Sequence, residues 1–151
     1  MSPRRDTRLS ADEQVALLRE ARKAALATVD ADGFPHVVAM SFLARDGAIY
    51  MTSYAKAQKV VNARRNPKVT VMIETGASYP EFRGVMIRGR CEVIEDPAQV
   101  ERVIREAADK SDGGAARPQP GALASAGKRV ILRVTPEKIA SWDHRKLGGA
   151  Y

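Results

Sequence analysis

Apolar residues recur along this chain at two different spacings, and each spacing predicts one kind of element. From Leu17 to Ala25 they follow a helical spacing, and Ser10 and Glu13 precede them as a capping box that satisfies free backbone donors. We therefore predict a first helix over residues 11–23. Residues 1–9 are polar and are predicted to be disordered.

Short apolar runs bounded by turn residues predict most of the chain as strands. Hairpin turns are expected at 30–33 and 45–47, where Asp and Gly residues gather. A break is expected at Thr135-Pro136, since proline removes a ladder donor. The predicted strands cover residues 25–29, 35–43, 48–52, 69–73, 82–94, 128–134 and 139–142.

Two further helices are predicted between the strands. One covers about 55–65 and stops before Pro67. The other starts at Asp96-Pro97, an N-cap residue followed by proline, and runs to about Lys110. Residues 111–127 are rich in Gly, Pro and Ala and are predicted to form a mobile loop.

The strands are joined mainly by short turns, and this connectivity decides the fold class. Strands joined by short turns pair antiparallel, which excludes a doubly wound nucleotide-binding fold. We predict a mainly β (α+β) protein, a closed or nearly closed antiparallel barrel with peripheral helices. A chain of 151 residues fits one such domain, covering 1–151.

The net charge of +7 favours anionic partners, which could be nucleic acid, an acidic membrane or a phosphorylated small molecule. Nucleic acid is the weaker candidate, because the basic residues are scattered and aromatic residues make up only 5% of the chain. No apolar stretch approaches the length of a membrane span. We therefore predict a small-molecule partner, with no nucleic acid and no membrane.

Cysteine and histidine usage limits the chemistry further. The single cysteine, Cys91, excludes an internal disulfide, fits a cytoplasmic location and is predicted to be a core residue without a redox role. The only histidines are His36 and His144, and no Cys/His cluster is present, so no metal site is predicted.

One segment has the features of an anion site. Thr52 and Ser53 end a predicted strand, and Lys56 and Lys59 lie three residues apart at the start of the predicted helix. Hydroxyls, free helix N–H groups, the helix dipole and two ammonium groups would together hold a phosphate. A capped helix with a solvated basic face is the alternative interpretation.

Several stretches together resemble the split β-barrels of the pyridoxamine 5'-phosphate oxidase-like superfamily. The resemblance is fairly specific because the stretches occur in the same order and spacing, and the last one is similar to the branch of deazaflavin (F420)-dependent reductases. The stretches are LATV at 26–29, DGFPHV at 32–37, KVVNARRNP at 59–67, FRGVMIRGRCEV at 82–93 and VTP to SWDHRKLGG within 134–149.

The resemblance implies a cofactor, FMN or coenzyme F420, in a groove between two subunits, and hence a homodimer. It implies that Gln58 and Lys59 hold the cofactor phosphate, and that Thr52 and Ser53 contribute hydroxyl and backbone contacts. Lys56 has no firm counterpart and is included on the helix spacing alone. The ring system would lie along a strand, mainly against its backbone groups, formed by His36, Val37, Val38, Ala39, Met40 and Ser41.

The resemblance also implies that a C-terminal segment, with Trp142, Arg145 and Lys146, reaches toward the cofactor. Trp142 could equally plug a dimer interface, and Tyr79 could line the substrate side or be a barrel-rim aromatic. His36 could donate to a ring carbonyl or be satisfied by a backbone carbonyl.

Departures from the family pattern narrow the function. His36 and Ser41 replace an arginine and a lysine of the vitamin B6 oxidases, and Gly84 replaces a glutamine near the ring. We therefore expect an oxidoreductase that transfers a hydride between F420 and an unsaturated or conjugated small organic substrate. The alternatives are an FMN-dependent oxidoreductase or oxidase and a non-catalytic flavin- or deazaflavin-binding protein.

Overall fold

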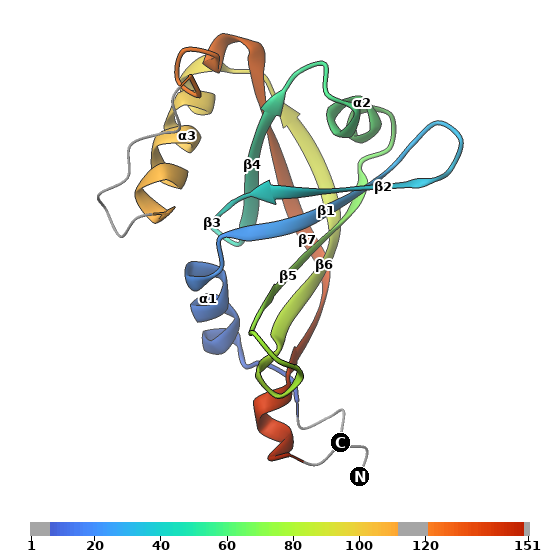
Figure 1. Ribbon diagram of the computed structural model, residues 1–151. Coiled ribbons are helices and arrows are strands. Elements are labelled where there is room, and N and C mark those ends of the chain that lie inside the picture. The colour runs from blue at the N-terminus through green and yellow to red at the C-terminus, as the bar shows by residue number, and fades with distance from the viewer. Residues whose placement is uncertain (1–6, 112–120, 150–151) are drawn as a thin grey trace.

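The computed structural model of the chain describes residues 7–111 and 121–149 (Figure 1). Seven strands form one antiparallel sheet in the order β2-β1-β5-β6-β7-β4-β3. They are β1 (Lys23–Val29), β2 (Pro35–Ser41), β3 (Leu43–Arg45), β4 (Ala48–Tyr54), β5 (Lys68–Thr75), β6 (Arg83–Ile94) and β7 (Arg129–Asp143). The helices are α1 (Ala11–Glu20), α2 (Gln58–Arg65) and α3 (Pro97–Ser111), with short 3-10 turns η2 (Tyr79–Glu81), η3 (Ala126–Lys128) and η4 (His144–Leu147).

The sheet curls so far that its edge strand β2 comes into contact with β4 near the other edge (Figure 1). This curled antiparallel sheet with three helices is a split β-barrel, as the sequence predicted. The barrel interior is filled by alternate residues of the strands, among them Leu26, Val71, Ile87 and Leu132, all buried. β2 pairs only with β1 and therefore keeps one backbone edge free of ladder bonds within the described sheet.

A second, smaller core lies on the opposite face of β4 and β7. Tyr50 and Ile131 pack there against Val100, Val103 and other apolar residues of α3. α3 therefore covers one end of the outer sheet face. The rest of that face, over β1, β2, β5, β6 and the second half of β7, has no helix packed on it among the described residues.

Four of the predicted boundaries are wrong. The first helix ends at Glu20 instead of residue 23, because the backbone becomes extended at Ala21 and β1 begins at Lys23. β7 continues through the expected break at Pro136, because a bulge opposite Gly89 absorbs the proline; a Cβ on Gly89 would lie 2.3 Å from the carbonyl oxygen of Thr135. The predicted strand over 35–43 is divided at Phe42, whose buried side chain separates β2 from β3. The helix predicted from residue 55 begins only at Gln58, after a turn.

The expected disorder at the N-terminus is wrong for residues 7–9. Thr7 and Leu9 are buried, and the Leu9 amide donates to Ser141 Oγ at 3.0 Å. Part of the expected mobile loop is also packed, since Ala126 is buried in the smaller core and Leu123 lies against it. The remainder of both predictions, at residues 1–6 and 112–120, falls outside the described part of the chain.

Candidate functional site

The N-terminus of α2 is open. Its N-cap, Ala57, has no side chain that can cap the helix, and Val60 and Val61 donate to the Ala57 carbonyl at 2.9 and 3.1 Å. The amides of Gln58 and Lys59 donate to no described residue. Two backbone donors and the positive end of the helix dipole therefore point outward, an arrangement that favours an anion.

A buried hydrogen-bond chain fixes this end of α2 on the sheet. Gln58 Nε2 donates to Asn62 Oδ1 at 2.7 Å, and Asn62 Nδ2 donates to Thr28 Oγ1 at 3.1 Å. Asn62 and Thr28 are almost fully buried. Because the chain joins the first turn of α2 to β1, the direction of the two free amides is set by the barrel.

His36 lies beside this hydrogen-bond network, directly opposite Thr28 in the β1–β2 pairing. Its Nδ1 atom is buried and has no hydrogen-bond partner among the described residues. A buried polar nitrogen without a partner is costly and is usually matched by a ligand or an ordered water. The residues present therefore fit an external polar group between β2 and the start of α2.

The two hydroxyls predicted to lie together are separated by the strand that carries them. Thr52 and Ser53 are both inside β4, paired with Ile131 and Val130. Neighbouring residues of a strand face opposite sides. Ser53 is buried on the interior side, where α2 packs, whereas Thr52 faces the side that carries α3. Only Ser53 can direct its hydroxyl toward the barrel interior.

The two predicted lysines also differ. Because α2 begins at Gln58, Lys56 lies in the preceding turn, closed by a bond from the Ala57 amide to the Tyr54 carbonyl. The helix-spacing argument for Lys56 is therefore wrong. Lys59 is half-buried in the first turn of α2 and forms no ion pair with a described residue. It is the cation best placed at the open helix end.

The buried face of α2 consists of Val60, Asn62 and Ala63. Val61 and Arg64 are exposed on the other side of the helix.

Tyr54 is the last residue of β4, at the start of the turn that precedes α2, and its side chain packs against another segment. Arg129 stacks over its ring at 4.3 Å. A hydrogen bond to Ser125, together with the positive charge of Arg129, lowers the pKa of the Tyr54 hydroxyl. These contacts attach η3 to the end of β4 and occupy the phenol.

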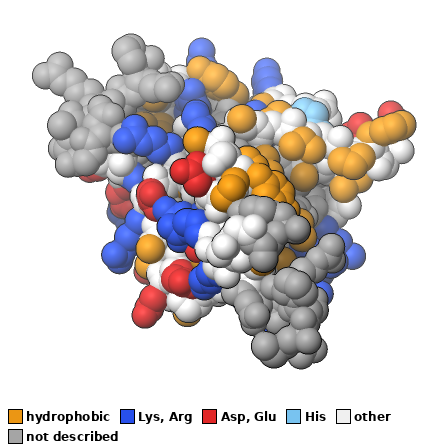
Figure 2. Space-filling model, turned by 60° about the horizontal axis from the view of Figure 1, so that its bottom comes forward, with side chains coloured by type: hydrophobic (Ala, Val, Ile, Leu, Met, Phe, Trp, Pro, Cys, Tyr) orange, Lys and Arg blue, Asp and Glu red, His pale blue; other side chains and the backbone are white. Residues whose placement is uncertain are grey.

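The strand predicted to line the ring borders a shallow apolar depression. The depression has a volume of about 270 Å³ and lies on the outer face of β1, β2 and β5. Ala25, Val37, Ala39 and Met72 form its floor, while the inward-facing Met40 is buried in the core. Figure 2 shows hydrophobic side chains gathered on the front of the molecule, where these strands lie. At its border Lys23 Nζ donates to Ser41 Oγ at 3.0 Å.

The predicted C-terminal residues lie at the other end of the molecule, around η4, far from α2 (Figure 1). Arg145 binds both carboxylate oxygens of the buried Asp143, at 2.9 and 2.6 Å, and this guanidinium lowers the pKa of Asp143. Lys146 Nζ donates to Glu13 Oε2 at 2.7 Å and to the Arg8 carbonyl. Within one chain both cations hold the C-terminal segment to the body.

Trp142 packs on the outer face of the sheet over Gly84, its partner in the β6–β7 register. A Cβ on Gly84 would lie 2.5 Å from Cζ2 of Trp142. The indole N–H donates to Glu74 Oε2 at 2.8 Å. The absence of a side chain at position 84 therefore leaves room for Trp142 of the same chain.

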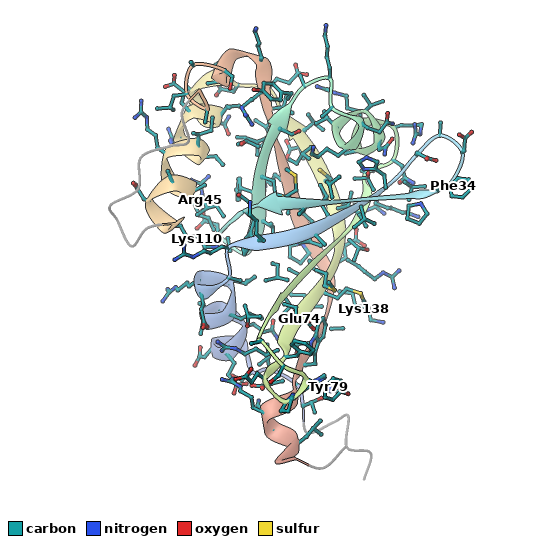
Figure 3. The ribbon with its side chains drawn as sticks, in the orientation of Figure 1. Phe34, Arg45, Glu74, Tyr79, Lys110 and Lys138 are labelled. Atoms are coloured by element: carbon teal, nitrogen blue, oxygen red, sulfur yellow. The ribbon has the colours of Figure 1, made fainter. Side chains whose placement is uncertain are left out.

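Tyr79 is exposed at the same end and forms a small aromatic cluster (Figure 3). Its ring lies 4.5 Å from that of His144, and its carbonyl oxygen lies 2.9 Å from His144 Nδ1. One chain does not bring this cluster together with the open end of α2.

Sequence reasoning missed the residues that position the site. Asn62 and Thr28 look like ordinary surface or strand residues in the sequence. The only signal was that the polar Asn62 lies between the apolar Val61 and Ala63 on a short helix. Glu74, the acceptor of the Trp142 N–H, gave no local signal, because the pairing is 68 residues apart in sequence.

Within the described ranges, no group of three or more His, Cys, Asp and Glu side chains could hold a metal ion. In the same part of the chain no helix is long and apolar enough to cross a bilayer.

The family model of pyridoxamine 5'-phosphate oxidase matches residues 10–143, which is most of the chain. The chain belongs to this family. The family binds flavin-type cofactors and includes oxidoreductases, and the split barrel of this chain has the family's architecture. No curated protein sequence matches the chain significantly.

Solved structures agree with the family. The chain is 35% identical to the conserved hypothetical protein Rv2991 from Mycobacterium tuberculosis, with a TM-score of 0.87 over 100% of this chain and 95% of the other. It is 29% identical to an F420 reductase, with a TM-score of 0.68 and coverage of 83% and 94%. It is 26% identical to a FAD-binding protein from Mesorhizobium loti, with a TM-score of 0.68 and coverage of 88% and 94%.

Proposed function

We propose that the chain binds coenzyme F420 and transfers a hydride between it and an unsaturated or conjugated small organic substrate. The observation that supports this most directly is the open end of α2. Two free amides and Lys59 lie there, next to the buried, unpartnered Nδ1 of His36. The 29% identity to an F420 reductase favours this coenzyme.

Each part of the site has a separate task in this proposal. The α2 amides and Lys59 bind the phosphate, and His36 makes a hydrogen bond to the coenzyme. The free backbone edge of β2 orients the ring through alternating donors and acceptors. When bound, the coenzyme supplies the hydride chemistry; the protein holds ring and substrate in contact and excludes water.

The proposed enzyme is a homodimer. Trp142, Tyr79 and their neighbours lie at the end of the barrel opposite α2, and β2 and β7 are separated by three strands of the sheet. Because η4 and α2 lie at opposite ends of the barrel, the C-terminal segment of one chain does not reach its own open α2 end. A second copy could place that segment over the ring and so form the substrate side.

FMN is the alternative cofactor, because the family binds flavin-type cofactors. We call the free α2 amides and Lys59 the cradle. An FMN-dependent oxidoreductase or oxidase, or a carrier without turnover, would use the same cradle. The cofactors can be compared directly, because F420 and FMN are both fluorescent and their emission or anisotropy changes on binding.

The test is a titration of the purified protein with F420 and with FMN, repeated with Lys59→Gln. Loss of one charge-assisted contact should weaken F420 binding by about 10- to 100-fold. Arg105→Gln, on the exposed surface of α3, is the matched control and should leave affinity unchanged. If the Lys59 variant bound both cofactors as tightly as wild type, the proposed cradle would be wrong. Tighter binding of FMN would favour the alternative.

A further inference from the structure

A second concave surface lies on the outer face of the sheet, away from the open end of α2. It has a volume of about 650 Å³ and extends from the end of the β1–β2 hairpin across β5 and β6 to β7. We name it the outer groove. Its cations are Lys68, Arg88, Arg90 and Lys138, and Thr70 lies between them on the same face.

The strand register places these four cations close together. Lys68 lies directly opposite Arg90 in the β5–β6 pairing, and Arg88 lies directly opposite Lys138 in the β6–β7 pairing. Directly opposed Cβ atoms are about 5 Å apart, and Arg88 and Arg90 are about 7 Å apart along one strand. The sheet therefore holds two like-charge pairs side by side.

The groove is only partly neutralised by the chain itself. Glu137 Oε1 lies 2.6 Å from Arg90 Nε. Lys68, Arg88 and Lys138 form no ion pair with a described residue. Figure 3 shows the Lys138 side chain extending outward from the sheet. Four cations against one carboxylate leave a net charge of +3.

The bulge in β7 helps to build this arrangement. Gly89 lets the β7 backbone approach, and Glu137 is the extra residue at that point, between Pro136 and Lys138 in the register. The same irregularity therefore brings Lys138 opposite Arg88 and turns Glu137 toward Arg90.

Like charges directly opposite each other destabilise a sheet, and a bound anion would relieve the repulsion. We propose that the outer groove is a binding site for a small polyanion with about three negative charges on adjacent phosphate or carboxylate groups. Arg88 and Arg90 can each bind such a group through two parallel N–H donors, and the lysines add point charges. This site is separate from the proposed coenzyme cradle.

The test uses full-length protein at low ionic strength, titrated calorimetrically with pyrophosphate and with citrate. We expect saturable binding of at least one, and a rise in Tm of about 5 °C at a hundredfold excess over Kd. The preferred probe shows whether phosphate or carboxylate groups are recognised. In R88Q/K138Q, Kd should rise at least tenfold.

Three controls make the result specific. R102Q/R105Q removes two exposed cations of α3 and should keep the wild-type Kd, as should Lys59→Gln, which alters only the cradle. Without ligand, R88Q/K138Q should melt at the same temperature as wild type or higher, because a like-charge pair is removed.

Several results would overturn the proposal. They are an absence of saturable binding, equal weakening in R102Q/R105Q, binding confined to duplex DNA, or a lower Tm of ligand-free R88Q/K138Q. The last result would mean that the four cations support the fold instead of a ligand.

Discussion

At the scale of single residues, Gly84 shows how closely Trp142 packs on the sheet. The sequence did not show which side chain fills the space beside Gly84. The indole of Trp142 occupies it, with Cζ2 and Cε2 2.5 and 2.8 Å from where a Cβ of residue 84 would lie. The backbone carbonyl of Ile73, at 2.7 Å from the same point, blocks the other direction.

Gly84→Ala should therefore destabilise the fold by about 1–3 kcal/mol, because neither the indole nor the backbone can yield freely. Thermal unfolding should show a Tm lower by several degrees. Gly127→Ala is the matched control, since a Cβ there meets no atom within 4 Å. Equal Tm values for the two variants would show that Trp142 does not pack as described.

For Cys91, the sequence was enough to predict burial in the core. It was predicted as a core residue from its apolar neighbours, and it is 7% exposed in β6. Burial raises the pKa of its thiol to about 12, so thiolate is scarce at neutral pH and the residue is chemically inert.

At the scale of elements, the C-terminal segment is anchored by one buried carboxylate. Asp143 is 1% exposed and is the N-cap residue of η4. Its carboxylate accepts hydrogen bonds from the amide and the guanidinium of Arg145. The guanidinium holds the pKa of Asp143 below its usual value. The contribution of ionised Asp143 to stability is therefore present above the unfolded-state pKa and is lost as the pH falls through the lower folded-state pKa.

Asp143→Asn should destabilise the protein at pH 7 by about 1–3 kcal/mol, because the guanidinium loses its charged partner. The difference from wild type should shrink as the pH falls below about 4, where the carboxylate of the unfolded chain is protonated first, and should vanish below the lower folded-state pKa of Asp143. Urea unfolding of both proteins at a series of pH values measures this difference in the free energy of unfolding. A difference that stays constant with pH would show that the ion pair contributes nothing.

The elements themselves could largely be predicted, and the errors have physical causes. Alternating apolar residues identified the strands of the barrel, because one face of each strand is buried. Pro136 was misjudged because the bulge opposite Gly89, which depends on a strand more than 40 residues away in sequence, was invisible locally. The start of α2 was misplaced because Ala55 and Ala57 favour helix, whereas the Ala55 amide donates to the Lys128 carbonyl and so holds a turn there.

At the scale of the whole molecule, the site could be predicted only in outline. Local sequence identified the segment that forms the open helix end and Lys59, because an open helix end depends on neighbouring residues. It missed that Thr52 and Ser53 face opposite sides, because β4 continues to Tyr54 instead of ending at Thr52. It could not show that His36 lies opposite Thr28, or that the four cations of the outer groove meet across β5, β6 and β7. Those facts depend on strand register, which long-range pairing sets.

The same register also produces an apolar row across the outer face of the barrel. Ala39, Ala25, Met72, Met86 and Ala140 follow one another in the pairings of β2, β1, β5, β6 and β7. Met72 and Met86 are 43% and 39% exposed, although both lie in the middle of a sheet. Exposed apolar side chains grouped in this way indicate a protein interface, and the proposed homodimer would bury them.

Met72→Glu should therefore convert the dimer to a monomer at micromolar concentration, since burying an unpaired carboxylate in an interface costs several kcal/mol. The monomer should stay folded, because residue 72 is exposed in a single chain. Val15→Glu, on the exposed side of α1 with 48% exposure, is the matched control and should remain dimeric. Sedimentation equilibrium measures the oligomeric state of both variants.

Loss of F420 binding should accompany dissociation in the Met72 variant alone, because the ring is proposed to lie between two copies. A monomeric wild-type protein that still binds the coenzyme would contradict the two-subunit site while leaving the cradle at α2 intact.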